Sequence, residues 1–114
     1  MFDISNKKIL ITGGSSGIGK ALAEGLFNAN ALVTCLDIRN PKGSKEIGYI
    51  KCDLSNIKSI DLALKQYIKN NSCPDVVINC AGTTHPGESN KYKQSDWDKT
   101  LKINLTAIFH ICKK

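Results

Sequence analysis

A segment rich in glycine and serine, residues 12–19, has the clearest potential for chemistry in this chain. It reads Thr-Gly-Gly-Ser-Ser-Gly-Ile-Gly and joins an apolar run, Lys8–Thr12, to a stretch with helical spacing, Gly17–Asn28. A turn with few side chains at this place can direct backbone N–H groups and the positive end of a helix onto a phosphate. The sequence therefore predicts a site for a ligand that carries phosphate.

Three glycines of this turn would have separate tasks. Gly13 would allow the tight turn, Gly17 would let a pyrophosphate come close, and Gly19 would let the helix pack on the strand. Glycines are common in any loop, so the motif alone is weak. The expected strand before it and helix after it are where a pyrophosphate site needs them, and they strengthen the prediction.

One carboxylate, Asp37, stands at the end of the next apolar run, Leu32–Asp37. At this place a carboxylate can accept hydrogen bonds from the ribose hydroxyls of an adenosine, and it would repel a 2′-phosphate. The alternative is an acid that only ends a strand. Together, residues 12–19 and Asp37 predict the binding of a dinucleotide.

These groups need a scaffold, and the chain alternates between strand-like and helix-like patterns that can provide it. Short apolar runs predict strands at Lys8–Thr12, Leu32–Asp37, 47–52 and 75–80. Helical spacing predicts helices at Gly17–Asn28, at 55–70 and from residue 95 to the C-terminus. The alternation predicts an α/β fold of the Rossmann type, a doubly wound parallel sheet with helices on both faces. Residues 1–114 would form one domain that stops after about four strands and the helix that follows the fourth.

Each predicted helix has an apolar face that we expect to pack on the sheet. In the first helix this face comprises Ile18, Leu22 and Leu26. In the second, which Ser55 would cap, it comprises Ile57, Ile60, Leu64 and Ile68. In the last, which residues 95–98 would open as a capping box, it comprises Trp97, Leu101, Leu105, Ile108 and Cys112. We expect at most one turn of helix in residues 38–46 and a loop at 83–93, with His85 exposed to solvent.

The composition is that of an ordinary folded chain with one modest core, since 41% of the 114 residues are hydrophobic and 23% are charged. The net charge is +6, but the lysines are scattered, so nucleic acid is not an expected partner. No apolar run is long enough to predict a membrane span. The five cysteines lack metal-binding or framework spacing, so neither a metal site nor disulfides are predicted. The N-terminus lacks a secretory layout, which favours a cytoplasmic location.

Five motifs together resemble the short-chain dehydrogenase/reductase family. They are TGGSSGIG, the Asp of LDIR, CDLS, INCAG and the Asn of KINLTAIF, in that family's order and spacing from Lys8 to the last residue. The resemblance implies an NAD(P)-dependent oxidoreductase that transfers hydride between nicotinamide and a small carbonyl or alcohol substrate. It does not specify which substrate.

The resemblance also implies how individual residues hold the cofactor. Ribose and phosphate would be held by the backbone of Ser15, Ser16, Gly17 and Ile18. Asp37 would select NAD, with NADP less favoured, although the guanidinium of Arg39 two residues later could tolerate a phosphate.

Two further segments have implied roles at the ends of the cofactor. Asp53 would accept a hydrogen bond from the adenine amino group, while the backbone N–H of Leu54 reaches a ring nitrogen. The backbone lining the other ribose would be that of Asn79, Ala81 and Gly82. Cys80 replaces the second Asn of the family's NNAG motif, which would loosen a hydrogen bond between neighbouring strands. Without the family, Asp53 is an acid at a strand end and Asn79 is a buried amide.

Asn104 lies on the apolar stripe of the last predicted helix, between Leu101 and Ile108. We expect a buried amide there, which costs about 1–3 kcal/mol unless it finds partners. One alternative is an amide bonded to neighbouring backbone. The resemblance instead implies a catalytic role, in which Asn104 perturbs the helix and anchors a water of the proton relay.

The family's general acid, a Tyr followed four residues later by a Lys, does not occur in this sequence. Tyr49, Tyr67 and Tyr92 are followed at that position by Asp, Asn and Asp. We therefore expect that this chain alone holds the cofactor but does not transfer hydride at a useful rate. Strand 75–80 would then be an edge of the sheet. The alternatives are an inactive nucleotide-binding module, a module completed by another chain, such as a second copy of itself, and a remnant that folds poorly.

Overall fold

The computed structural model describes residues 3–39 and 46–113. In chain order the elements are β1 (Lys8–Thr12), α1 (Gly17–Asn28), β2 (Leu32–Asp37), β3 (Gly48–Lys51), α2 (Ile57–Asn71), β4 (Val76–Asn79), the 3₁₀ turn η1 (Ser89–Lys91), α3 (Gln94–Leu101), the π-helical segment η2 (Lys102–Thr106) and α4 (Ala107–Lys113). The first two strands and α1 have the predicted bounds. β3 and β4 are each shorter than predicted by one residue at both ends.

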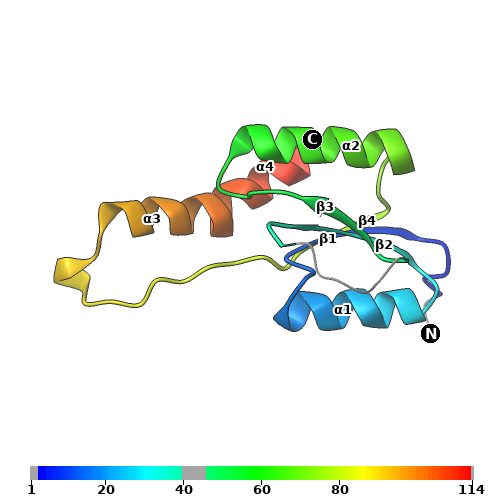
Figure 1. The fold of residues 1–114 in the computed structure, drawn as a ribbon, viewed down its shortest axis with the longest axis horizontal. Coiled ribbons are helices and arrows are strands. Elements are labelled where there is room, and N and C mark those ends of the chain that lie inside the picture. The colour runs from blue at the N-terminus through cyan, green and yellow to red at the C-terminus, as the bar shows by residue number, and fades with distance from the viewer. Residues whose placement is uncertain (1–2, 40–45, 114) are drawn as a thin grey trace.

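A parallel sheet forms the centre of the molecule. Its strand order is β3-β2-β1-β4, and every neighbouring pair is parallel. Helix α1 covers one face, and α2 and α4 lie together on the other (Figure 1). This confirms the doubly wound α/β architecture. β4 is an edge strand of the described sheet, as expected.

The strands are apolar on both sides because helices cover both faces of the sheet. Successive side chains of a strand point to opposite faces. Leu10 therefore joins the cluster beneath α2 and α4, while its neighbours Ile9 and Ile11 join the cluster beneath α1. In β2, Leu36 belongs to the cluster beneath α2 and α4, and its neighbour Cys35 belongs to the cluster beneath α1. One continuous apolar run thus supplies both cores.

Helix α1 packs on the sheet mainly through its smallest residues; of the predicted apolar face, Leu26 packs against the core, whereas Ile18 and Leu22 do not. Gly19 and Ala23 are buried, whereas Ile18 is 76% exposed and Leu22 39% exposed. A Cβ on Gly19 would collide with the carbonyl oxygen of Gly13. The helix therefore lies too close to the strand end for a larger side chain to fit between them.

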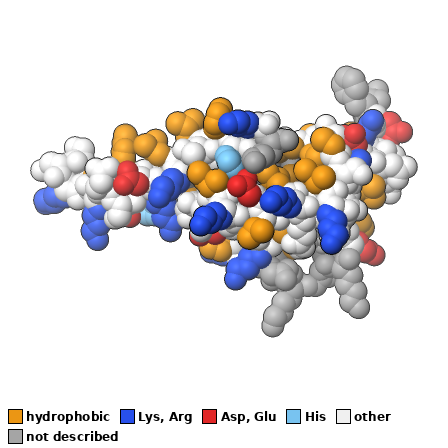
Figure 2. Space-filling view, turned by 90° about the horizontal axis from the view of Figure 1, so that it is seen from above, with side chains coloured by type: hydrophobic (Ala, Val, Ile, Leu, Met, Phe, Trp, Pro, Cys, Tyr) orange, Lys and Arg blue, Asp and Glu red, His pale blue; other side chains and the backbone are white. Residues whose placement is uncertain are grey.

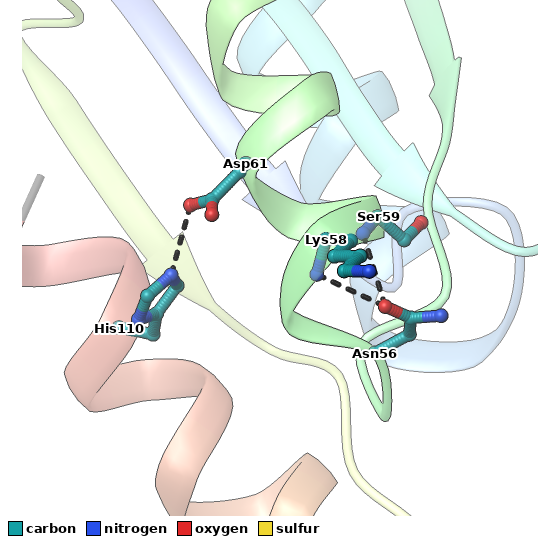
Figure 3. A network of polar contacts seen from close by, with 5 residues as sticks. All are labelled: Asn56, Lys58, Ser59, Asp61 and His110. Carbon is teal, nitrogen blue, oxygen red and sulfur yellow. Dashed lines mark hydrogen bonds and ion pairs between the residues drawn. The ribbon is translucent and has the colours of Figure 1, made fainter.

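Helix α2 begins at Ile57, and its cap is Asn56 rather than the predicted Ser55. The side-chain oxygen of Asn56 accepts hydrogen bonds from the backbone N–H groups of Lys58 at 2.9 Å and Ser59 at 3.3 Å (Figure 3). Ser55 is unavailable because its hydroxyl donates to Asp53.

The buried face of α2 also differs from the predicted one. It consists of Ile60, Ala63, Leu64 and Tyr67. Ile57 and Ile68 are about half exposed. Tyr67 belongs to the core because its ring packs among the apolar residues under α2, a place the four-residue apolar spacing did not indicate.

The last predicted helix is not continuous. It divides into α3, η2 and α4, and it starts at Gln94 after Lys93, so the capping box at residues 95–98 was wrong. Only Ala107 and Ile111 are buried, while Trp97, Leu101, Leu105 and Cys112 of the predicted face are exposed. The reason is that α3 projects beyond the sheet, and only α4 returns to pack beside α2 (Figure 1).

A polar contact joins α4 to α2. The imidazole Nε2 of His110 lies 2.9 Å from Oδ1 of Asp61, and both side chains are partly buried (Figure 3). Together with the packing of Ala107 and Ile111, this contact fixes where the last helical segment returns to the sheet.

The surface contains isolated charges rather than one basic region. Figure 2 shows Lys and Arg side chains separated from one another across the face seen from above. In the described part of the chain, no helix is both long and apolar enough to cross a membrane. All five cysteines are free thiols, and Cys35 and Cys52 are buried. Of the predicted segment 38–46, residues 40–45 lie outside the described residues.

Replacing Gly14 by Ala is expected to destabilise the fold by about 1–3 kcal/mol, because the added Cβ would overlap Cys35, whose own Cβ lies 2.7 Å away. The matched variant is Gly25→Ala, where no atom lies within 4 Å of the added Cβ. It should stabilise α1 by up to about 1 kcal/mol. Urea unfolding of both variants tests this, and equal stabilities would contradict the packing described here.

Candidate functional site

A cleft of about 610 Å³ lies at the edge of the sheet where the strands end. Segments that follow all four strands line it, together with Lys99 of α3 and Ile103 of η2. The sheet thus brings together residues that are far apart in the sequence. The site residues predicted from sequence that line this cleft are Gly13, Ser16, Ile18, Gly19, Asp37, Asp53, Leu54, Ala81 and Gly82.

The four other predicted residues lie beside the cleft without lining it. Ser15 contacts Asp37, and Gly17 stands between two lining residues of the same turn. Asn79 ends β4 next to the lining residue Cys80, and Asn104 bonds to the backbone of Thr83, which also lines the cleft.

The turn between β1 and α1 has the backbone that its glycines predict. Gly13 has φ = 72° and Gly17 has φ = 54°, conformations that glycine adopts without strain. A Cβ on Gly13 would lie 2.9 Å from the Cα of Ala81, so this glycine lets two loops touch. At Gly17 nothing lies within 4 Å of the corresponding position. Open space therefore faces the start of α1.

The N-terminus of α1 is free to attract an anion. Ser16 occupies the cap position, but its side chain makes no capping hydrogen bond, and the first turn has no acidic residue. The N–H groups of a first helical turn have no partners within the helix, and the helix dipole adds positive potential there. The geometry suits a phosphate at this end of the cleft.

Asp37 connects the end of β2 to the same turn. Its Oδ2 accepts the backbone N–H of Ser15 at 3.1 Å, and its Oδ1 accepts the backbone N–H of Arg39 at 3.0 Å. Partial burial raises the pKa of Asp37, but the hydrogen bonds from Ser15 and Arg39 outweigh it and hold the pKa below its ordinary value. The group is therefore a carboxylate at neutral pH, placed at the cleft.

Thr12 is a positioning residue that sequence reasoning missed. Its hydroxyl oxygen accepts the backbone N–H groups of Cys80 and Ala81, each at 3.1 Å. The side chain is buried, and it ties the end of β1 to the loop after β4. The signal was available, since a hydroxyl at the end of a buried strand needs a partner.

The segment after β3 brings a second carboxylate to the cleft. Oδ1 of Asp53 accepts the backbone N–H of Ser55 at 3.0 Å and its hydroxyl at 2.6 Å. These two bonds lower the pKa of Asp53, opposed by a smaller effect of burial, and the charge of Lys99 lowers it further. The backbone N–H of Asp53 donates to Ser59, which holds the segment against α2.

Two buried polar atoms have no partner among the described residues, and both lie beside the cleft. They are Oγ of Ser15 and Oδ1 of Asn79. A buried polar atom without a hydrogen bond is costly, which points to a polar ligand at this place. The amide nitrogen of Asn79 lies 3.7 Å from the sulfur of Cys112.

Asn104 is exposed, so the prediction of a buried amide was wrong. Its Oδ1 accepts the backbone N–H of Thr83 at 2.8 Å, and its Nδ2 donates to the carbonyl of Thr83 at 2.8 Å. This is the alternative of an amide bonded to neighbouring backbone. Asn104 also lies within η2, where the π-helical turn interrupts the regular helix. The helical periodicity contained no signal for that interruption, whereas the family resemblance predicted that Asn104 perturbs the helix, and this part of the prediction is confirmed.

Two other residues differ from expectation. His85 is half-buried rather than exposed, and its Nδ1 lies 3.2 Å from the hydroxyl of Thr100. Lys99 was not singled out from the sequence, although it stands four residues before Ile103 and therefore on the same helical face. In the described part of the chain, no group of His, Cys, Asp and Glu is arranged to hold a metal ion.

Comparisons with known proteins give a consistent result. The family model described as short chain dehydrogenase matches residues 7–114. Among curated proteins, 3-oxoacyl-[acyl-carrier-protein] reductase of Buchnera aphidicola is 33% identical over 118 residues, which cover 96% of this chain and 48% of that protein. Nodulation protein G of Rhizobium sp. is 31% identical, and the match covers 100% of this chain and 49% of that protein. This chain thus spans about half the length of the curated relatives it matches.

Solved structures share the fold. A short chain dehydrogenase from Leptospira borgpetersenii, with bound NAD+, superposes with a TM-score of 0.89 at 30% identity, over 97% of this chain and 45% of that one. The aldohexose dehydrogenase of Thermoplasma acidophilum, in ligand-free form, gives a TM-score of 0.90 at 27% identity. The superposition covers 97% of this chain and 43% of that one.

The contribution of Asp37 to stability should depend on pH. Its folded-state pKa lies below the ordinary value of 3.8, so the stabilisation is present above that value and is lost as the pH falls through the lowered pKa. We expect the free energy of unfolding of the wild type to exceed that of Asp37→Asn at neutral pH, and this difference to shrink as the pH falls below 3.8. Asp98→Asn, a change on α3 away from the cleft, is the control. A difference that stays constant with pH would contradict this assignment.

Proposed function

We propose, since this chain belongs to the short-chain dehydrogenase family, that it holds the nicotinamide dinucleotide of an oxidoreductase acting on carbonyl or alcohol groups. The observation that carries the proposal is the cleft, in which the glycine turn, Asp37 and Asp53 meet at the ends of three neighbouring strands. The Leptospira relative holds NAD+, and a 4-hydroxyisoleucine dehydrogenase with 30% identity is complexed with NADH.

The described residues fit such a ligand. A pyrophosphate would lie at the N-terminus of α1, where Gly17 leaves open space and the first turn has no side-chain cap. The hydroxyl of Ser15, which has no hydrogen-bond partner among the described residues, would donate to a phosphate oxygen there. When bound, the nicotinamide supplies the chemistry of accepting or donating a hydride.

We assign the adenosine to the other end of the cleft. The carboxylate of Asp37 would accept hydrogen bonds from the ribose hydroxyls, which favours NAD over NADP because a 2′-phosphate would be repelled. Arg39, which also lines the cleft, reduces that preference. Asp53 would accept from the adenine amino group, and the backbone N–H of Leu54 would donate to a ring nitrogen.

Residues near β4 would serve the nicotinamide half. The backbone of Ala81 and Gly82 would line its ribose, and Thr12 fixes that loop through Cys80 and Ala81. We assign Asn104 to the proton relay, where it would position a water. A Tyr-x-x-x-Lys pair does not occur in the 114 residues, so these residues alone do not hold the family's general acid for hydride transfer.

The second candidate is a nucleotide-binding module that another chain completes. The observation in its favour is the open edge at β4 together with Leu105 and Phe109, which are 64% and 65% exposed. A free strand edge and large exposed apolar side chains are each typical of a surface that another segment covers. Both candidates predict nucleotide binding without turnover by these 114 residues alone, so the deciding measurement is hydride transfer by the protein expressed from its native gene. Turnover would decide for the oxidoreductase, and nucleotide binding without turnover would favour the module.

Replacing Gly17 by Glu should abolish NAD binding, because a carboxylate would enter the space assigned to the pyrophosphate and repel it. We expect the affinity to fall at least about a hundredfold. Gly17→Ala is the matched control, since it introduces the same strain at φ = 54° without a charge. Calorimetric titration with NAD measures both, and equal binding by the two variants would contradict the phosphate assignment.

Replacing Asp37 by Ala should narrow the preference for NAD over NADP by about tenfold, because the group that repels the 2′-phosphate is removed. The ratio of the two dissociation constants is the measurement. An unchanged ratio would show that Asp37 is not the ribose ligand.

A further inference from the structure

Lys99 and Ile103 form a wall of the cleft that the sequence motifs do not include. Both residues come from the helical segment that projects beyond the sheet, and they line the same cleft as Asp53 and Leu54. They are four residues apart, so they share one helical face. Neither ion pair found among the described residues involves Lys99. An unpaired ammonium group therefore stands at the end of the cleft assigned to adenine.

The carboxylate beside this wall is only half satisfied. Oδ1 of Asp53 accepts both hydrogen bonds from Ser55, whereas no described residue donates to Oδ2. The hydrogen bonds of Ser55 and, to a smaller degree, the charge of Lys99 lower the pKa of Asp53. The free oxygen is thus an acceptor that a ligand donor can use, and the neighbouring cation favours its ionised form.

We propose that Lys99 is a positioning residue for the purine base, closing the adenine end of the cleft beside Asp53, which accepts from the exocyclic amino group. The inference rests on the proposed function, because it needs a dinucleotide in this cleft. Long lysine side chains bury their aliphatic stem while the charged end stays in water. The stem of Lys99 and the side chain of Ile103 would cover the flat face of the base.

Other charged and titratable residues also lie near Asp53, and they must remain unchanged in a test of Lys99. They are Cys52 beside it, Asp37 and Arg39 at the end of the neighbouring strand β2, Lys58 on α2 and Lys102 on η2. Only a comparison of variants at one position can separate the effect of Lys99 from theirs.

The first test compares Lys99→Gln with Lys93→Gln in the otherwise unchanged protein. Both changes remove one exposed lysine charge from the same helical segment, but Lys93 lies at the cap of α3 and does not line the cleft. Calorimetry with NAD, AMP and nicotinamide mononucleotide is the measurement. Lys99→Gln should weaken NAD and AMP about fivefold and leave nicotinamide mononucleotide unchanged. Lys93→Gln should bind all three like wild type.

The second test is a double-mutant cycle with Asp53. In an Asp53→Asn background, Lys99→Gln should lose most of its effect on AMP binding, because both side chains act on the same base. Full additivity of the two changes would overturn the proposal.

The possible results distinguish a failure of the proposed function from a failure of the role of Lys99. If the wild type binds NAD, and Lys99→Gln binds AMP with the affinity of the wild type, the role of Lys99 is overturned and the proposed function stands. Wild type that does not bind NAD would overturn the proposed function and this inference with it. If Lys99→Gln loses the same affinity for AMP as for nicotinamide mononucleotide, this would also contradict a role of Lys99 at the base.

Discussion

The end of β1 is packed so tightly that Gly14 and Gly19 have no room for a Cβ atom, and the rest of the structure depends on this close approach. It brings α1 onto the sheet through Gly19 and Ala23. It also aims the uncapped start of α1 at the cleft, since the turn from β1 contains two glycines and two small serines and no bulky side chain that would hold the helix away. Thr12 then ties the loop after β4 to the same point. Backbone packing, rather than a set of reactive side chains, thus creates the site.

This packing separates a rigid part of the site from a more loosely supported part. The turn, Asp37 and Asp53 rest on strands whose apolar side chains fill both cores. The wall formed by Lys99 and Ile103 belongs to a segment that projects beyond the sheet and is supported mainly by α4 against α2 and by the two hydrogen bonds between Asn104 and Thr83. The phosphate and ribose positions are therefore better defined by the fold than the position of the base.

The sequence was sufficient for the elements whose signal is local. Apolar runs located β1 and β2, and the glycine turn located the site, because these patterns follow directly from backbone geometry. Packing faces were harder to predict. Ile18 and Leu22 dominate the apolar pattern of α1, yet the close approach of the helix buries its small residues instead.

Other features depend on competition between partners that no local pattern records. Ser55 is a good capping residue, but Asp53 takes its hydroxyl and Asn56 becomes the cap. The π-helical turn at Asn104 adds a residue to one turn, which helical periodicity does not reveal. The wall at Lys99 arises only when α3 is placed against the ends of the strands.

The most direct test of the central claim is a crystal structure of the protein with NAD. We expect the pyrophosphate to lie at the first turn of α1, the adenosine ribose to contact the carboxylate of Asp37, and the adenine to lie between Asp53 and Ile103. A nucleotide bound elsewhere, or a cleft that stays empty at saturating NAD, would contradict it.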